Sequence, residues 1–403
     1  MIVLSGASLV LPDRILSPGT LVIDGDRIAE IRSDAPSPGH PHSLFAFHGH
    51  HIVPGFIDVH VHGIEGFDSL DEGDPIAAIA QRLPRYGVTA FCPTTVACAP
   101  APLRGVLDQV RAARAARAPH SARVLPAHLE SNFINPEYRG AQPSACLRSP
   151  RAAQGSGDSG GWGASDILAE IERGAPDVGI VTLAPELEGA LDLIASLTSR
   201  GHRVSLGHSG ATYEEALAAV AAGACHATHL FNRMPPLHHR APGLAGAVLQ
   251  ADEVAAEIIC DGFHVHPALV RMAVAAKGPS RVFAITDATA VAGLPAGSRA
   301  RLGGREITAG SSVAHLADGT VAGSAVTMDR AFKTLVGSGI SLVDAATVCA
   351  TTGARELGLV GYGILAPDAV ADIVVLDASF SVVQTYVAGR LVYSRNTPPP
   401  PTV

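Results

Sequence analysis

The stretch PGFIDVHVHG, residues 54–63, decides both the fold and the chemistry of this chain. A Pro-Gly pair precedes the apolar run Phe56–Val61, which has the length and composition of one buried β-strand. The run ends in a His-x-His pair, and because side chains alternate along a strand, His60 and His62 point to the same side. Two imidazoles at one strand end, together with a carboxylate and further histidines from other strands, suit a borderline divalent cation such as Zn2+. The pair alone does not establish a metal site, so the residues at the other strand ends decide.

Seven further β-prone runs follow that strand, and helical patterns separate most of them. Asp74-Pro75 predicts a helix start, with an N-cap and a proline at the first helical position, and Thr212 to Glu215 fits a capping box. The alternation over residues 54–362 predicts an α/β fold, a TIM-like (β/α)8 barrel. The expected strands are Phe56–Val61, Val88–Cys92, Val124–Leu129, Gly179–Leu183, Arg203–Leu206, Ala224–His229, Ala255–Cys260 and Arg281–Thr286.

The two chain ends have a different texture, with short β-prone runs separated by turns. Residues 1–53 and 363–397 are therefore predicted to pair into one small β-sandwich domain beside the barrel. Residues 398–403, which begin with four prolines, are expected to form a disordered tail. The Gly/Ser-rich residues 154–163 are expected to form an insertion loop, with a lid over the site as the alternative.

Composition and charge limit the class of protein. The chain has 403 residues, of which 47% are hydrophobic and 16% charged, which excludes disordered and coiled-coil proteins. The net charge of −8 disfavours binding to nucleic acids or anionic membranes, so an anionic ligand would need a local cationic pocket. No apolar run reaches the roughly 18–20 residues that span a bilayer, and the N-terminus lacks a signal-peptide pattern. Six scattered cysteines without a Cys-x-x-Cys pair indicate free thiols in a cytoplasmic protein.

Ionisable residues follow most of the predicted strands. Glu130 follows the third strand, His208 the fifth, His229 the sixth and Asp287 the eighth. The carboxyl ends of barrel strands line one rim, so we expect these side chains to meet the His-x-His pair there. A bound divalent metal lowers the pKa of its water to about 7. Asp287 would take a proton from that water and return it to a leaving amine.

Two other residues near strand ends are interpreted as structural. His226 lies three residues before His229, so on a strand it points to the opposite face, and we expect it to pack or to support a ligand. Glu186 ends the fourth strand and is expected to orient its neighbours rather than to react.

Eight short motifs occur in order along nearly the whole chain. They are PGFIDVHVHG (54–63), HLE (128–130), VTLAPE (181–186), LGHSGAT (206–212), ATHLFNRMPPLHHRAPGLAG (227–246), DGFHV (261–265), ITDATAVAG (285–293) and AGSAVTM (322–328). In this order, and with a small β-domain built from both ends, the chain resembles the N-acetylglucosamine-6-phosphate deacetylase family of the amidohydrolase superfamily. The THLFN, RAPGLAG and DGFHV segments are the most specific of these motifs.

The resemblance implies a metal centre with assigned ligands. Glu130, His208 and His229 would hold the main ion, and the His-x-His pair would permit a second ion bridged by Glu130. One or two divalent ions, with Zn2+ as the first choice, are therefore implied. Asp287 would be a further ligand and the catalytic acid and base.

The resemblance also implies how the substrate is held. His264 would contact a sugar hydroxyl, and the backbone at Asn232 and Arg233 would line the phosphate site. Arg240 would grip the phosphate through its planar guanidinium, in the family often across the interface of a homodimer. That arginine would supply the local positive charge that this acidic chain otherwise lacks. The expected partners are thus a small-molecule sugar and a second copy of the chain.

Two positions depart from the family pattern. Ser131-Asn132 follows Glu130 where the family has Gly-Pro, which adds polar groups beside a ligand. Gln142 stands where the family has a histidine that contacts the acetyl carbonyl of the substrate. The amide of Gln142 can donate a hydrogen bond but carries no charge. Loss of one such donor costs about 2.7–4 kcal/mol, so a neutral substitute should cost less.

The predicted function is metal-dependent hydrolysis of an amide bond. The enzyme would remove the N-acetyl group of an amino sugar, in the first instance N-acetylglucosamine 6-phosphate, and release glucosamine 6-phosphate and acetate. Gln142 keeps open a different N-acetyl sugar, whether unphosphorylated, epimeric or biosynthetic, although Arg240 favours the phosphate. A non-catalytic scaffold barrel would be expected to lose metal ligands, and here all the expected positions are filled.

Overall fold

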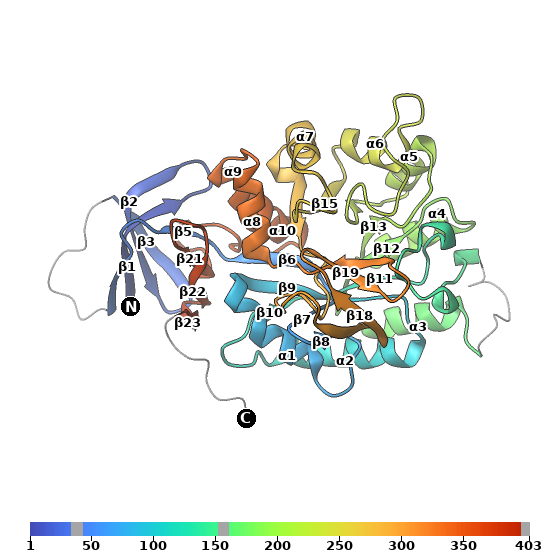
Figure 1. Ribbon diagram of the computed structural model, residues 1–403, viewed down its shortest axis with the longest axis horizontal. Helices are drawn as coiled ribbons and strands as arrows, with labels where there is room; N and C mark the ends of the chain where they lie inside the picture. Colours follow the sequence, from blue (N-terminus) through green and yellow to red (C-terminus); the bar gives the residue numbers. More distant parts are fainter. Residues whose placement is uncertain (34–42, 152–160, 396–403) are drawn as a thin grey trace.

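The structure is a computed structural model in which residues 1–33, 43–151 and 161–395 are described. A barrel surrounded by helices makes up most of the molecule, and a sheet that holds both chain ends lies at one end of it (Figure 1). The tail predicted at 398–403 and most of the loop predicted at 154–163 lie outside the described residues.

Parallel strands form the barrel and confirm the predicted (β/α)8 fold. Eight strand positions follow the order β6, β9, β11, β12, β13, β14, β15 and β16, and β10 extends the third position beside β9. The barrel closes between β16 and β6, where Val61 pairs with Ala288. The strands are β6 (Phe56–Val61), β9 (Val88–Thr95), β10 (Arg123–Val124), β11 (Ala127–Glu130), β12 (Val178–Leu183), β13 (Arg203–Leu206), β14 (His226–Ala227), β15 (Ala255–Ile259) and β16 (Val282–Ile285).

The strand predicted at Val88–Cys92 continues to Thr95, and two other barrel strands differ more from the prediction. The run Val124–Leu129 is not one strand, because Pro126 has no N–H for the sheet and separates β10 from β11. The sixth strand, β14, is much shorter than the predicted Ala224–His229, and it cannot extend through His229 because the backbone there is in the left-handed region, with φ of 32°. Both deviations come from the backbone rather than from the hydrophobic pattern.

A helix follows each strand position and packs against the outside of the barrel, where apolar side chains form the main core (Figure 1). Asp74 and Pro75 begin the first of them, and the Thr212 hydroxyl accepts the Glu215 N–H, which confirms both predicted helix starts. Among the described residues, no helix combines the length and apolar character needed to cross a membrane. The helices are α1 (Pro75–Arg82), α2 (Pro100–Ala115), α3 (Ala164–Gly174), α4 (Ala190–Ser199), α5 (Tyr213–Ala221), α6 (Gly243–Gln250), α7 (Pro267–Lys277), α8 (Met328–Gly337), α9 (Leu342–Ala346) and α10 (Thr352–Glu356).

A four-stranded antiparallel sheet lies between β16 and α8, within the region predicted to be barrel alone. It consists of β17 (Arg299–Leu302), β18 (Arg305–Ala309), β19 (Val313–Leu316) and β20 (Val321–Ser324). Gly303-Gly304 joins β17 to β18 as a two-residue hairpin, a signal in the sequence that the barrel prediction did not use. Leu302 and Val321 line the cavity described below, so this insertion forms part of the site wall.

Strands from both chain ends form a single eight-stranded sheet. β5 pairs with β1 on one side and with β21 on the other, and so joins the two ends of the chain. Leu4, Leu21, Ile52 and Tyr386 are fully buried in its core. The predicted domain boundaries and sandwich form stay predictions. The strands are β1 (Ile2–Val10), β2 (Ile15–Asp24), β3 (Arg27–Arg32), β4 (Ser43–Ala46), β5 (His51–Pro54), β21 (Ile373–Leu376), β22 (Val382–Val387) and β23 (Arg390–Ser394).

Candidate metal centre

A cavity of about 510 Å³ lies at the carboxyl ends of the barrel strands. TIM barrels carry their active sites at this end of the strands, and the volume is typical of a pocket for a small ligand. The sequence-predicted site residues that line it are His62, Glu130, Gln142, His208, His229, Asn232, Arg233, His264 and Asp287. The other lining residues are Val96, Glu137, Tyr138, Ala141, Phe231, Met234, Phe263, Leu302, Val321 and Gly323.

One cluster of buried ligand atoms consists of Glu130, His208 and His229. Glu130 ends β11, and the two histidines follow β13 and β14. The Glu130 Oε1 atom lies 2.7 Å from His208 Nε2 and 3.0 Å from His229 Nε2, and the two Nε2 atoms are 3.0 Å apart. The three side chains lie close enough together to share one ion.

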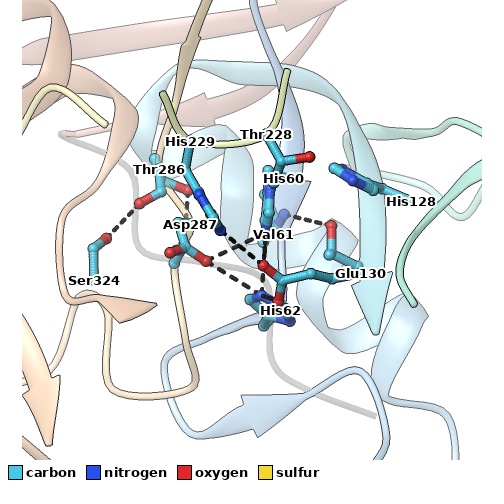
Figure 2. Close-up of polar contacts among 12 residues, drawn as sticks. His60, Val61, His62, His128, Glu130, Thr228, His229, Thr286, Asp287 and Ser324 are labelled. Atoms are coloured by element: carbon cyan, nitrogen blue, oxygen red, sulfur yellow. Dashed lines mark hydrogen bonds and ion pairs between the residues drawn. The ribbon is translucent and has the colours of Figure 1, made fainter. Parts of the chain in front are cut away.

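A second cluster consists of His60, His62 and Asp287. The two histidine Nε2 atoms are 3.2 Å apart, and Asp287 Oδ1 lies 3.4 Å from that of His60 and 3.2 Å from that of His62. Glu130 of the first cluster lies beside His62 of the second (Figure 2). Its Oε2 atom is 3.5 Å from His62 Nε2. The six side chains that were expected to meet at one rim of the barrel do so, and they form two adjacent clusters.

The backbone at three of these residues is strained. His208, His229 and Asp287 have φ values of 48°, 32° and 49°, in the left-handed region that favours glycine. Each such residue costs about 1–3 kcal/mol, and such strain clusters at functional sites. All three side chains line the cavity, so the strained backbone serves to present them there.

At His208 and His60 a lone pair, rather than an N–H group, faces the centre of the clusters. The His208 Nδ1–H donates to the Tyr138 carbonyl at 2.8 Å, so in the neutral ring the Nε2 atom that faces Glu130 carries a lone pair. In the same way, the Nδ1–H of His60 donates to Glu257 Oε2 at 3.0 Å and leaves its Nε2 lone pair toward His62. Converging lone pairs repel one another unless a cation lies between them. Imidazole and carboxylate ligands suit Zn2+ and similar ions, so these residues fit a divalent metal.

The electrostatics also favour a cation. Burial would raise the pKa of Glu130, but the adjacent histidines outweigh burial and hold that pKa well below its usual value. Burial lowers the pKa of His60 to about 4. Burial would also lower the pKa of His62, but its hydrogen bond to Asp287 and the charge of Glu130 raise that pKa to about 9. The ionised carboxylates of Glu130 and Asp287 therefore attract positive charge to this rim, and a divalent ion would supply it.

Gln142 lies against the first cluster. Its Oε1 atom accepts the Ala97 N–H at 2.7 Å, and this contact turns its Nε2 toward Glu130 Oε2, to which it donates. The side chain is buried and lines the cavity. The amide therefore presents N–H donors at the wall of the site, where the resemblance implies a histidine.

The other departure from the family pattern has a structural role. Ser131 Oγ donates to the Thr182 carbonyl at 2.5 Å, and Asn132 Nδ2 donates to the carbonyls of Cys98 and Cys146 at 2.8 and 2.7 Å. Both side chains are buried, and neither residue lines the cavity. They fix the segment after Glu130.

The remaining sequence-predicted substrate residues are divided between two places. Asn232, Arg233 and His264 line the cavity, and the His264 Nδ1–H donates to Asp261 Oδ2 at 2.6 Å. Arg240 is exposed in the segment between β14 and α6 and does not line the cavity of the single chain. The structure therefore brings three of these four residues to the site.

The amidohydrolase family model matches residues 51–392, which is most of the chain. The chain belongs to the amidohydrolase family. N-acetylglucosamine-6-phosphate deacetylase from Rattus norvegicus is 38% identical to this amidohydrolase, over 97% of this chain and 94% of the rat protein. N-acetylgalactosamine-6-phosphate deacetylase from Escherichia coli O157:H7 is 35% identical, over 84% of this chain and 87% of that protein.

A solved structure has the same fold. It is a mutant of N-acetyl-D-glucosamine-6-phosphate deacetylase from Mycobacterium smegmatis, in complex with N-acetyl-D-glucosamine-6-phosphate. The two chains share 33% sequence identity with a TM-score of 0.86, over 98% of this amidohydrolase and 99% of that chain. The expected family and barrel are thereby confirmed.

Glu257 is the site residue that sequence reasoning missed. It lies in the middle of β15, an apolar strand, and its carboxylate reaches His60 across the barrel interior. Burial raises the pKa of Glu257. In this amidohydrolase the carboxylate fixes the tautomer and the orientation of His60, as outer carboxylates do for metal-binding histidines. The one available signal was an acidic residue inside an otherwise apolar strand.

Further polar side chains form the floor of the barrel beneath the site. Asp58 Oδ2 accepts the Thr286 hydroxyl at 2.6 Å, beside Asp287, and burial raises the pKa of Asp58 to about 7. His128 Nε2 lies 2.8 Å from Thr182 Oγ1, which continues the network to β12. These contacts hold strand ends in register around the rim.

The two residues interpreted as structural lie where expected. Glu186 accepts hydrogen bonds from Ser209 Oγ, the Gly210 N–H and Asn135 Nδ2, and so holds the turn after His208. His226 packs against Phe283 away from the ligand clusters.

Proposed function

We propose that this amidohydrolase removes the N-acetyl group of N-acetylglucosamine 6-phosphate and releases glucosamine 6-phosphate and acetate. The observation that carries the proposal is the convergence of six side chains, four imidazoles and two carboxylates, at one rim of the barrel. The named activities of the rat and mycobacterial relatives support the choice of substrate.

Glu130, His208 and His229 would hold one divalent ion, and His60, His62 and Asp287 would hold a second beside it. Zn2+ is the proposed ion, since imidazole nitrogens and carboxylate oxygens are among its usual ligands. When bound, such an ion polarises a carbonyl oxygen and makes a water molecule acidic enough to attack at neutral pH.

Asp287 is the proposed acid and base. Its side chain is 11% exposed, lines the cavity and lies beside both histidines of the His-x-His pair. Burial would raise the pKa of Asp287, but the adjacent imidazoles outweigh burial and lower it, so the side chain is present as the ionised carboxylate, the form that can accept a proton. It takes one proton from the attacking water as the water oxygen bonds to the acetyl carbon. It then gives that proton to the nitrogen as the C–N bond breaks.

Gln142 would donate a hydrogen bond to the acetyl carbonyl. Its contact with Ala97 already fixes the amide with its nitrogen toward Glu130. A donor placed in advance stabilises the negative charge that develops on the carbonyl oxygen. His264 would hold a sugar hydroxyl from the opposite wall.

A homodimer would complete the phosphate site. Arg240 is exposed and outside the cavity of its own chain, which is the arrangement expected if it serves the site of a partner. The backbone at Asn232 and Arg233 would line the same phosphate site.

The six cysteines form no disulfide in the described part of the chain, which supports a cytoplasmic location.

A second candidate substrate is N-acetylgalactosamine 6-phosphate, because one relative at 35% identity carries that activity in its name. The two sugars share the acetamido group and the phosphate and differ only at one ring carbon. Both are therefore compatible with the metal centre and with a phosphate site.

Acetate release tests the proposal. The purified protein, loaded with Zn2+, is given N-acetylglucosamine, N-acetylgalactosamine and their 6-phosphates, and the rate of acetate formation is compared. We expect the fastest release from N-acetylglucosamine 6-phosphate. Equal rates with and without the phosphate would refute the phosphorylated substrate, and a faster rate with the galactosamine epimer would select the second candidate. A protein without metal or chelator sensitivity would be a scaffold rather than an enzyme.

A further inference from the structure

The cavity has few permanent positive charges with which to bind a phosphate. Among the described residues that line it, Arg233 is the single arginine and there is no lysine, whereas Glu130, Glu137 and Asp287 are acidic. A phosphorylated sugar must therefore find a cation at this arginine, at the metal or on a second chain.

Arg233 is held in place by its backbone. It follows His229 by four residues, has φ of 53°, and its carbonyl accepts the Ser209 N–H at 3.0 Å. The side-chain amide of Asn232 caps the same turn through the carbonyls of His229 and Leu230, at 3.2 and 3.3 Å. The Cα atom of Arg233 thus has a fixed position at the edge of the metal site.

The side chain of Arg233 extends from that point across the cavity wall. It packs on Gly140, where an added Cβ would lie only 2.5 Å from the Arg233 Nε atom, so a larger residue there would displace this side chain. Its Nη2 donates to the carbonyl of Val321, in β20, at 3.4 Å. The guanidinium therefore lies between the segment that leads to Gln142 and the inserted sheet.

Most of the hydrogen-bonding capacity of this guanidinium is free. Of its five N–H donors, one binds the Val321 carbonyl, and the described residues provide no other hydrogen bond or ion pair. A guanidinium matches phosphate oxygens with two parallel hydrogen bonds. Because the group is exposed at the cavity, a ligand can reach these donors.

We infer that the side chain of Arg233, and not only its backbone, binds the substrate phosphate from within the same chain and sets the preference for phosphorylated sugars. This inference rests on the proposed function, and it gives each subunit a cation of its own beside that expected from Arg240 of a second copy. Arg233 is then a specificity-determining residue, because it favours one substrate without taking part in bond breaking.

The test compares Arg233→Met with a matched control, Arg139→Met. Methionine keeps the apolar stem over Gly140 and removes the charge. Arg139 is exposed next to Gly140, donates to the Pro136 carbonyl at 3.1 Å and does not line the cavity. The readout is kcat/KM for N-acetylglucosamine 6-phosphate and for N-acetylglucosamine.

In Arg233→Met, kcat/KM for the 6-phosphate is expected to fall about 10- to 100-fold, mainly through KM, as for a lost hydrogen bond to a charged group. In the same variant, kcat/KM for N-acetylglucosamine is expected to change by less than about twofold. In Arg139→Met, kcat/KM for either sugar is expected to change by less than about twofold. Arg233→Lys should recover part of the loss. Equal losses on both sugars, or no loss on either, would overturn the inference.

Calorimetry with inorganic phosphate separates this inference from the proposed function. Wild-type protein is expected to bind phosphate more tightly than Arg233→Met and as tightly as Arg139→Met. If the wild type hydrolyses none of the sugars but shows this pattern, the proposed function fails and the phosphate site stands. Equal phosphate affinity in wild type and Arg233→Met would refute the site itself.

Discussion

Replacement of Glu257 tests whether its hydrogen bond to His60 orients that imidazole for binding a metal ion. The Glu257 Oε2 atom accepts the His60 Nδ1–H at 3.0 Å, and both side chains are fully buried. Loss of such an outer partner typically lowers metal affinity 10- to 100-fold, which corresponds to about 1.4–2.7 kcal/mol. Because His60 belongs to the second cluster, the effect should fall mainly on the ion held there and less on the ion held by Glu130, His208 and His229.

Two substitutions separate the effect of the Glu257 charge on metal affinity from the effect of its hydrogen bond. Glu257→Gln keeps the shape and an oxygen acceptor but removes the charge, so we expect about tenfold weaker binding, the lower end of the range. Glu257→Ala also leaves the His60 Nδ1–H buried without an acceptor, which costs about 1–3 kcal/mol, so we expect a loss near 100-fold.

The assay is a competition titration of metal-free protein with Zn2+ and a chromophoric chelator, which yields an affinity for each binding step. Asp372→Asn is the matched control, since Asp372 is 2% exposed and accepts the Ala388 N–H at 2.7 Å outside the metal site. Melting of each metal-free variant verifies that it folds. Unchanged affinity in Glu257→Ala, or the same loss in the control, would refute the role of Glu257.

Four further predictions follow from the site and its surroundings. Asp287→Asn should lower acetate release by about 10²- to 10⁴-fold, the range for loss of an acid–base group, and metal analysis should show the ion at Glu130 retained. Gln142→His should speed hydrolysis of the 6-phosphate, and a slower rate would show a pocket suited to another substrate. Chelation should abolish turnover and lower the melting temperature, and Zn2+ should restore both, since about 2.7 kcal/mol of stability is gained at a metal concentration of 100 Kd. Burial would raise the pKa of Glu356, but contacts with His226 and Arg355 lower it to about 2 from 4.5. The ionised Glu356 therefore contributes its full stabilisation above pH 4.5 and loses it as the pH falls toward 2. The difference in unfolding free energy between wild type and Glu356→Gln should therefore shrink from pH 4.5 to pH 2. Near pH 7 this difference should not change with pH.

The sequence by itself determined the barrel and the rim that carries the chemistry. Strand-forming runs, helix starts at Asp74 and Thr212, and ionisable residues after strand ends are local signals, and the closed barrel turns them into one ring. Because the carboxyl ends of parallel strands share one rim, the positions of Glu130, His208, His229 and Asp287 along the chain were enough to predict that they meet.

Only the tertiary structure decided which side chains support that ring. Glu257 contacts His60 across 197 residues of chain, and neither hydrophobic periodicity nor turn chemistry encodes a contact between two strand interiors. Leu302 and Val321 reach the cavity through an inserted sheet, and the placement of Arg233 inside it and Arg240 outside it follows from the path of one loop. The physical reason is that local patterns fix the type of each element and its inward face, whereas the register and closure of the barrel fix which side chains touch.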